Sequence, residues 1–97
     1  MRKVLIVFLL IVCNASAITH RATLRWNRGN YPASVQYRVY RSRSKTGTYT
    51  RLAQITVPSY VDTAVSKGVT YWYFVTAYNT VTKCESVNSN IVSTKIP

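Results

Sequence analysis

The chain has 97 residues, and its 13 Lys+Arg against 2 Asp+Glu give a formal net charge of +11. This length suits one domain, and a content of 47% hydrophobic and 12% aromatic residues is too high for a disordered basic tail. The acidic side chains are Asp62 and Glu85, and the single histidine is His20. These few groups exclude a catalytic zinc site, and a Ser-His-Asp or Cys-His set would need His20. We therefore expect no enzyme, no metal and no cofactor.

Residues 1–17 have the layout of a secretory signal peptide. The positive pair Arg2-Lys3 precedes an apolar run from Val4 to Val12, and Ala15-Ser16-Ala17 supplies the small residues of a cleavage site. We expect cleavage after Ala17 and secretion to the extracellular space or the periplasm. The alternative is an uncleaved membrane anchor, but an apolar stretch of about 14 residues falls short of the roughly 20 that span a bilayer.

Cleavage would leave a domain of residues 18–97, in which 11 Lys+Arg face two acids, for a net charge of +9. Cys13 would be lost, so the mature chain would hold the single thiol of Cys84 and no internal disulfide, although it meets an oxidising compartment. An exposed Cys84 would allow a disulfide between two chains. The alternative is a small apolar residue packed against its loop.

The mature chain is typical of β structure throughout. Apolar residues alternate with polar ones or form short β-branched and aromatic runs, and no stretch has helical spacing. Turn residues separate the runs at intervals of roughly 8–12 residues, which indicates an all-β antiparallel sandwich. The expected strands are residues 22–26, 35–40, 49–55, 59–62, 70–78 and 89–96.

Six stretches in this order resemble the fibronectin type III domain, an immunoglobulin-like sandwich, and most closely the small variants of exported bacterial and phage-encoded proteins. They cover nearly the whole mature chain, from Thr23 to Pro97, so the resemblance is specific for the fold and says little about the partner. The stretches are Thr23-Leu24-Arg25-Trp26, Tyr37-Arg38-Val39-Tyr40-Arg41-Ser42, Gly47-Thr48-Tyr49, Ser59-Tyr60-Val61-Asp62, residues 68–73 with 75–77, and Glu85-Ser86 with Ser89-Asn90.

The resemblance gives several residues structural roles. Trp26 would fill the centre between the sheets, and Tyr71 would form a tyrosine corner whose hydroxyl bonds backbone in the preceding loop. We expect Gly68 to supply a positive φ in that loop and Asp62 to accept backbone N–H bonds at a turn. The other expected inward side chains are Leu24, Tyr37, Val39, Tyr73 and Val75.

Two departures from the family pattern matter. Only residues 18–21 lie between the expected cleavage site and the family's strand B, so strand A is expected to be short or absent and the B–E sheet to have an exposed edge. The chain also lacks an Arg-Gly-Asp cell-attachment triplet, and Arg28-Gly29-Asn30 is no substitute. Integrin adhesion is therefore not expected.

Asp62 and Glu85 flank the long strand at residues 70–78, which places them roughly 26 Å apart at about 3.3 Å per residue. A glycosidase needs its two carboxyl groups within about 10 Å, so we expect these two to be structural turn residues. His20 would lie beside the new N-terminus as a solvated residue.

The candidate binding surface is the outward face of the family's C–F sheet with the basic turn beside it. Aromatic rings stack on sugars or bases, and arginine adds cation–π contacts. The alternative is ordinary cross-strand pairing on a sheet face. The candidate residues are Arg38, Tyr40, Trp72, Phe74 and Tyr78 on the face, and Arg41, Arg43 and Lys45, together with Arg51, around the turn.

We therefore expect a secreted, non-enzymatic module that binds a protein or an anionic glycan at the cell envelope or extracellular surface. Strong positive charge attracts polyanions, but no nucleic-acid motif is present, so specific nucleic-acid binding is not expected. The alternative is a structural subunit of a surface or phage virion assembly that docks through the exposed sheet edge.

Overall fold

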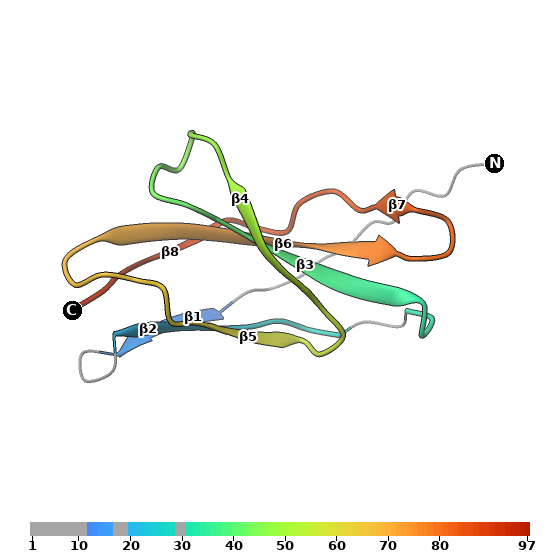
Figure 1. Cartoon of the computed structure of the whole chain (residues 1–97), viewed down its shortest axis with the longest axis horizontal. Helices are drawn as coiled ribbons and strands as arrows, with labels where there is room; N and C mark the ends of the chain where they lie inside the picture. Colours follow the sequence, from blue (N-terminus) through green and yellow to red (C-terminus); the bar gives the residue numbers. More distant parts are fainter. Residues whose placement is uncertain (1–11, 17–19, 29–30) are drawn as a thin grey trace.

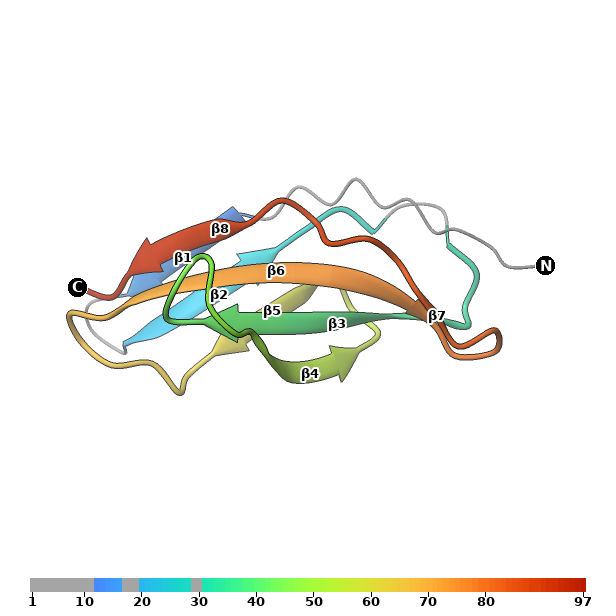
Figure 2. The same ribbon diagram turned by 90° about the horizontal axis from the view of Figure 1, so that it is seen from above.

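The computed structural model describes residues 12–16, 20–28 and 31–97, and this part of the chain contains strands and turns but no helix. The strands form two antiparallel layers, one lying over the other (Figures 1 and 2). The strands are β1 (Val12–Ser16), β2 (Arg21–Arg25), β3 (Val35–Ser42), β4 (Thr50–Ile55), β5 (Ser59–Asp62), β6 (Thr70–Asn79), β7 (Cys84–Glu85) and β8 (Val92–Lys95).

The smaller layer has the strand order β1-β2-β5, and the larger one has β4-β3-β6 with both β7 and β8 paired to β6. All pairs are antiparallel, and β3 and β6 share the longest register, from Val35 opposite Asn79 to Ser42 opposite Trp72. The predicted all-β antiparallel sandwich is confirmed. No helix long and apolar enough to span a membrane occurs in the described residues.

The C-terminal part of the chain differs from the prediction in two ways: the strand expected at residues 89–96 is shortened to β8, and the short strand β7 lies in the segment expected to be a loop. Between them, Ser86 and Ser89 replace the regular ladder. The Oγ atoms of Ser86 and Ser89 accept the N–H groups of Ala77 and Val75 at 2.9 and 2.8 Å. Their own N–H groups donate to the carbonyls of Ala77 and Val75 at 2.8 and 2.9 Å. Serine side chains therefore satisfy the edge of β6 where the backbone leaves the ladder.

The edge that we expected to be exposed is covered by β1. This strand is a short strand A of five residues, paired with β2 so that Cys13 lies opposite Leu24. It lies upstream of residues 18–21, where only a remnant of strand A was expected, and inside the stretch predicted to be a signal peptide. Residues 1–11 of that stretch and the predicted cleavage site at residues 17–18 lie outside the described residues. Gly29 and Asn30 of the Arg28-Gly29-Asn30 triplet also lie outside them.

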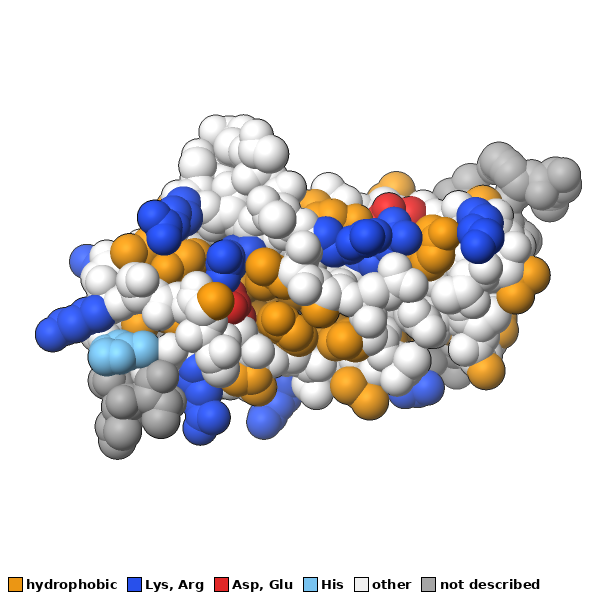
Figure 3. All heavy atoms as spheres, in the orientation of Figure 1, with side chains coloured by type: hydrophobic (Ala, Val, Ile, Leu, Met, Phe, Trp, Pro, Cys, Tyr) orange, Lys and Arg blue, Asp and Glu red, His pale blue; other side chains and the backbone are white. Residues whose placement is uncertain are grey.

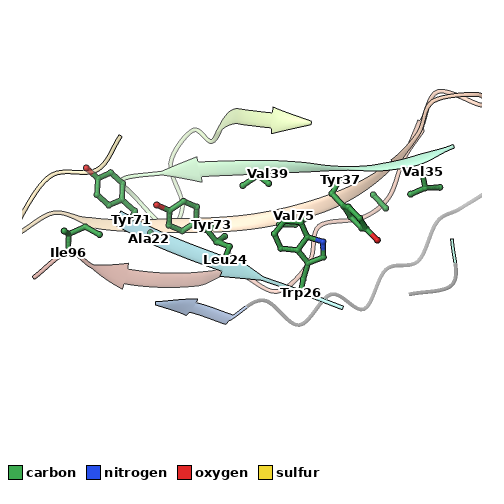
Figure 4. Close-up of a cluster of buried hydrophobic side chains, with 11 residues drawn as sticks. Ala22, Leu24, Trp26, Val35, Tyr37, Val39, Tyr71, Tyr73, Val75 and Ile96 are labelled. Carbon is green, nitrogen blue, oxygen red and sulfur yellow. The ribbon is translucent and has the colours of Figure 1, made fainter. Parts of the chain in front are cut away.

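The core lies between the layers and is built from the side chains predicted to point inward. Leu24, Val39, Tyr73 and Val75 are fully buried, and Tyr37 is 2% exposed. Trp26 extends from the end of β2 toward the other layer, where its ring meets the Tyr37 ring edge-on at 5.5 Å between centroids (Figure 4). Each such buried side chain contributes on the order of 1.5–3 kcal/mol, so a chain with no disulfide among its described residues depends on these rings.

The loop before β6 contains the predicted tyrosine corner. The N–H of Ser66 donates to the Tyr71 hydroxyl at 2.8 Å. Gly68 has the predicted positive φ, 80°, and donates its N–H to the carbonyl of Ile96 at 2.8 Å. Both predictions are confirmed, and together these bonds hold the crossover from β5 to β6 against the C-terminal end of β8.

Candidate binding face

The outer face of the larger sheet carries the candidate site. The term outer face denotes the outward side chains of β3, β4, β6 and β7. The pairing register places Arg38 between Thr76 of β6 and Gln54 of β4, and it places Tyr40 opposite Phe74. The members of the outer face described below are Arg38, Tyr40, Gln54, Trp72, Phe74, Thr76, Tyr78 and Glu85.

Glu85 is the acceptor at the centre of a polar network on the outer face. Tyr40 Oη donates to its Oε2 at 2.6 Å, and Thr76 Oγ1 donates to the same oxygen at 2.6 Å. Arg38 Nη1 lies 3.1 Å from Oε1, as an ion pair. Glu85 lies on β7 and not in a loop, and its carboxylate is engaged by three side chains from two other strands.

The network shifts two pKa values. Burial raises the pKa of the Glu85 carboxyl, but the hydrogen bonds from Thr76 and Tyr40 and the interaction with Arg38 outweigh burial, so that the pKa lies below its usual value of 4.5. Burial raises the pKa of the Tyr40 hydroxyl above 10.0, and the hydrogen bond to the Glu85 carboxylate adds to this. Glu85 is therefore a stable anion at neutral pH, which is the state that holds Arg38.

Arg38 is held on three sides. Its Nε donates to Gln54 Oε1 at 2.9 Å, its Nη1 meets Glu85, and its guanidinium carbon lies 3.6 Å from the centroid of the Tyr78 ring. A cation fixed on an aromatic ring forms a flat, amphipathic patch. Arg38 and Tyr78 are thus brought together as the outward-face prediction required.

Phe74 does not lie exposed, contrary to our expectation of an aromatic platform. Its ring is stacked on Tyr40 at 4.7 Å between centroids and contacts Tyr49 at 4.9 Å, and Phe74 is only 8% exposed. Trp72, one pair further along β6, is partly exposed and lies opposite Ser42 and Ser93, which are small. Trp72 and Tyr78, rather than Phe74, are thus the accessible rings of β6.

Arg41 does not belong to the outer face. It follows Tyr37 and Val39 on the inward side of β3, and its Nη1 lies 2.8 Å from Asp62 Oδ2, on β5 of the other layer. Asp62 is 2% exposed and also accepts the N–H of Ala64 at 3.1 Å, which is the predicted turn bond. The Arg41 side chain therefore bridges the layers, away from the outer face, and its assignment to the binding residues stays a prediction.

The pair of Arg41 and Asp62 is embedded in further bonds. Tyr73 Oη donates to Asp62 Oδ2 at 2.7 Å, and Arg41 also donates to the carbonyl of Ala64 at 3.0 Å. Burial lowers the pKa of Arg41, but the hydrogen bond and the charge of Asp62 raise it more, so that the pKa lies above its usual value. The arginine is therefore permanently charged and serves the fold.

The remaining candidate cations, Arg43 and Lys45, are exposed in the loop that connects β3 to β4 and stands out from the sheet (Figure 1). Arg51, on β4, is also exposed. Both acidic side chains of the protein are already paired with Arg38 and Arg41. Lys and Arg side chains spread along the molecule in Figure 3, with acidic atoms showing only in small spots beside them.

Among the described residues, the reactive side chains of His20 and Cys84 belong to no cluster of possible metal ligands. His20 has a φ of 47° and precedes β2, and Cys84, on β7, is a partly buried free thiol. Within residues 12–16, 20–28 and 31–97 there is no group of three His, Cys, Asp or Glu side chains that could hold a metal.

Two members of the Glu85 network were missed at the sequence level. Thr76 is 1% exposed and Gln54 lies on the neighbouring strand. Strand alternation gave the signal for Thr76, since it stands between Phe74 and Tyr78 in the outward row. Gln54 gave no signal, because its position opposite Arg38 depends on the register of β3 and β4.

With the geometry described, comparison with known proteins identifies the family. No family model and no curated protein matches the chain. Among solved structures, a Fn3-like protein from Clostridium thermocellum is 31% identical, with a TM-score of 0.78, and the match covers 94% of this chain and 93% of that one. The chain therefore belongs to the fibronectin type III family, as the sequence resemblance predicted.

Two larger proteins contain a similar fold. Pectate lyase PelI from Erwinia chrysanthemi is 19% identical with a TM-score of 0.74, and the match covers 91% of this chain but 27% of the lyase. A beta-1,2-glucanase from Parabacteroides distasonis is 28% identical with a TM-score of 0.67, and the match covers 92% of this chain and 13% of the glucanase. The chain thus corresponds to a small part of each of these enzymes.

Proposed function

We propose that this protein is an exported, non-catalytic fibronectin type III module that binds an anionic glycan through the outer face and the basic loop beside it. The observation that carries the proposal is the use of both acidic side chains in ion pairs with Arg38 and Arg41. The other basic side chains meet no Asp or Glu in the salt bridges of the described residues. A surface of this charge concentrates polyanions.

The chemistry of the outer face suits a charged sugar chain. Trp72 and the Arg38–Tyr78 pair present flat surfaces on which sugar rings stack. Arg43 and Lys45 lie in the neighbouring loop, where they would meet carboxylates or sulfates of the sugar. Arginine suits this role, because its planar fork binds a carboxylate through two parallel hydrogen bonds.

The known proteins with similar parts support a glycan. One of the matched structures is pectate lyase PelI in complex with tetragalacturonic acid, an acidic oligosaccharide. The match covers 27% of that chain and is 21% identical, so the ligand is a property of the lyase and only a guide here. Another matched structure, the beta-1,2-glucanase, is named for a glycan as well.

The non-catalytic part of the proposal is supported by the state of the two carboxylates. Asp62 is enclosed between the layers, and Glu85 accepts bonds from three side chains on the outer face. Neither carboxylate is left to act as acid or base without breaking these bonds. Export is supported by the signal-peptide layout of residues 1–17.

The test is salt-dependent retention of the exported protein on immobilised polygalacturonate, with neutral galactan as the uncharged control. We expect retention on polygalacturonate that is lost as the NaCl concentration rises, and weaker retention for Arg43→Ala/Lys45→Ala and for Trp72→Ala. Arg21→Ala/Arg25→Ala removes the same charge from the other layer and is the matched control. If both double variants lose retention equally, binding depends on net charge alone and not on a defined face. Equal retention on polygalacturonate and on neutral galactan would also contradict the proposal.

A further inference from the structure

The segment that forms β1 has two roles that exclude each other. Its backbone pairs with β2 over five residues, from Val12 opposite Arg25 to Ser16 opposite Arg21. The same residues lie N-terminal to the expected signal cleavage site after Ala17. A chain that keeps this segment has a closed edge, and a chain that loses it does not.

The cleavage itself is a hydrolysis catalysed by a signal peptidase. Water adds across the peptide bond between Ala17 and Ile18, which leaves a carboxylate on Ala17 and an ammonium group on Ile18. The released peptide carries β1 with it. The N–H and C=O groups of β2 that pair with β1 then lose their partners, and β2 becomes an edge strand, with β5 as its remaining neighbour.

The loss reaches beyond the ladder, because β1 also lies alongside β8 of the other layer. Ala22 and Leu24, the inward residues of β2, are completely buried in the intact sandwich. Ile96, just after β8, is completely buried as well. Removal of the covering strand therefore leaves an elongated site whose floor is apolar and whose edge offers backbone hydrogen bonds, which is the arrangement that an added strand fills.

The outward residues of β2 select the occupant by charge. Arg21 and Arg25 are exposed and flank Thr23 on the same face of the strand. A second copy of this chain, pairing β2 with β2 antiparallel about Thr23, would place Arg21 directly opposite Arg25 in both halves of the ladder. Like charges directly opposite each other are destabilising, so a symmetric dimer is disfavoured, whereas acidic residues at these positions are favoured.

We infer that the exported protein, cut after Ala17, accepts an extended acidic strand of a different protein along β2, in the place that β1 occupies in the uncut chain. The incoming strand runs antiparallel to β2, with acidic residues opposite Arg21 and Arg25 and small apolar residues opposite Ala22 and Leu24. The uncut chain is closed to this partner, so export and opening of the site are one event. The inference rests on the export proposed above but not on glycan binding.

The test starts with the protein purified from the exported fraction of producing cells. Its N-terminal sequence and intact mass should show a chain that begins at Ile18. Analytical ultracentrifugation should show that this chain sediments as a monomer. A chain that still contains residues 12–16, or one that dimerises through β2, would overturn the inference.

The second stage is titration of that protein with a peptide whose central residues are Glu-Ala-Thr-Val-Glu, and with the matched peptide that has Lys at both Glu positions. We expect binding of the acidic peptide about tenfold tighter, from two cross-strand charge pairs, and slower hydrogen exchange at β2 amides. Arg21→Glu/Arg25→Glu should reverse the preference, and Arg43→Ala/Lys45→Ala should leave it unchanged. Equal affinity for the two peptides, no binding, or unchanged exchange in β2 would each disprove the strand acceptor, whatever the result with polygalacturonate.

Discussion

Arg41 on β3 and Asp62 on β5 form an ion pair that joins the two layers, with 2.8 Å between Nη1 and Oδ2. The Asp62 side chain is 3% exposed and that of Arg41 23%, so the pair lies at the margin of the core. Asp62 also holds the hydroxyl of Tyr73 and the N–H of Ala64. One of the two acidic residues of the chain is thus a joint between the sheets.

Asp62→Ala should destabilise the protein strongly, because it removes the carboxylate that pairs with Arg41 and that accepts hydrogen bonds from the Tyr73 hydroxyl and the Ala64 N–H. Breaking a buried pair costs about 3–5 kcal/mol, and the partial exposure of Arg41 places this variant at the lower end. Urea unfolding measures the loss. Glu85→Ala, which breaks the more exposed ion pair with Arg38, is the control and should cost less. A smaller loss for Asp62→Ala than for Glu85→Ala would refute the joint.

Trp26→Ala should cost about 3–5 kcal/mol, as other truncations of large core side chains do. Trp26 is 6% exposed, and its ring packs against Tyr37 between the layers. A domain of this size has a total stability of about 5–15 kcal/mol, so the variant is expected to be close to unfolding. Thermal unfolding followed by circular dichroism is the measurement. A variant that melts at the temperature of the parent protein would contradict the placement of this ring in the core.

Tyr71→Phe should destabilise by about 1–2 kcal/mol, because the Ser66 N–H loses its acceptor while the ring stays in place. Tyr78→Phe removes a hydroxyl from the partly exposed ring below Arg38 and should change stability by much less. Denaturant midpoints are measured for both variants, so that the effect of the Tyr71 hydroxyl can be compared with that of the surface hydroxyl of Tyr78. Equal midpoints would show that the corner bond contributes nothing.

The stability of the protein should depend on pH through Glu85, because the pKa of Glu85 is lower in the folded protein than its usual value. Such a group contributes stability that is fully present above the unfolded-state pKa. The contribution is lost as pH falls through the folded-state pKa. The free energy of unfolding of the parent minus that of Glu85→Gln should therefore be constant near neutral pH and should shrink below about pH 4.3. A difference that grows on acidification would contradict the lowered pKa.

Much of the fold was predictable because alternation is a local signal. Tyr37, Val39, Tyr73 and Val75 recur at every second residue, which is the strand period, and all point inward. The same rule placed Arg38, Tyr40 and Tyr78 outward. Applied one residue further along β3, the alternation rule also places Arg41 inward. The sequence analysis instead grouped Arg41 with the cations around the turn, because it is charged. The row of inward residues was the better guide, since a partly exposed arginine can lie at the margin of the core when a carboxylate is within reach.

The contents of the candidate site were less predictable than its position. Arg38 contacts Glu85, 47 residues further along the chain, and Arg41 contacts Asp62, 21 residues away. No local pattern links such residues. The contact of the Tyr49 ring with Phe74 depends in the same way on the path of the loop between β3 and β4.

The amino-acid sequence by itself determined the class of fold, the inward and outward rows of β3 and β6, the corner at Tyr71 and the excess of positive charge, because each of these follows from residue type and spacing along the chain. The tertiary structure alone decided which cation each carboxylate binds, and that residues 12–16 pair with β2 as strand A. Partners of this kind are brought together when the two layers close, and closure depends on contacts between residues that are distant in sequence.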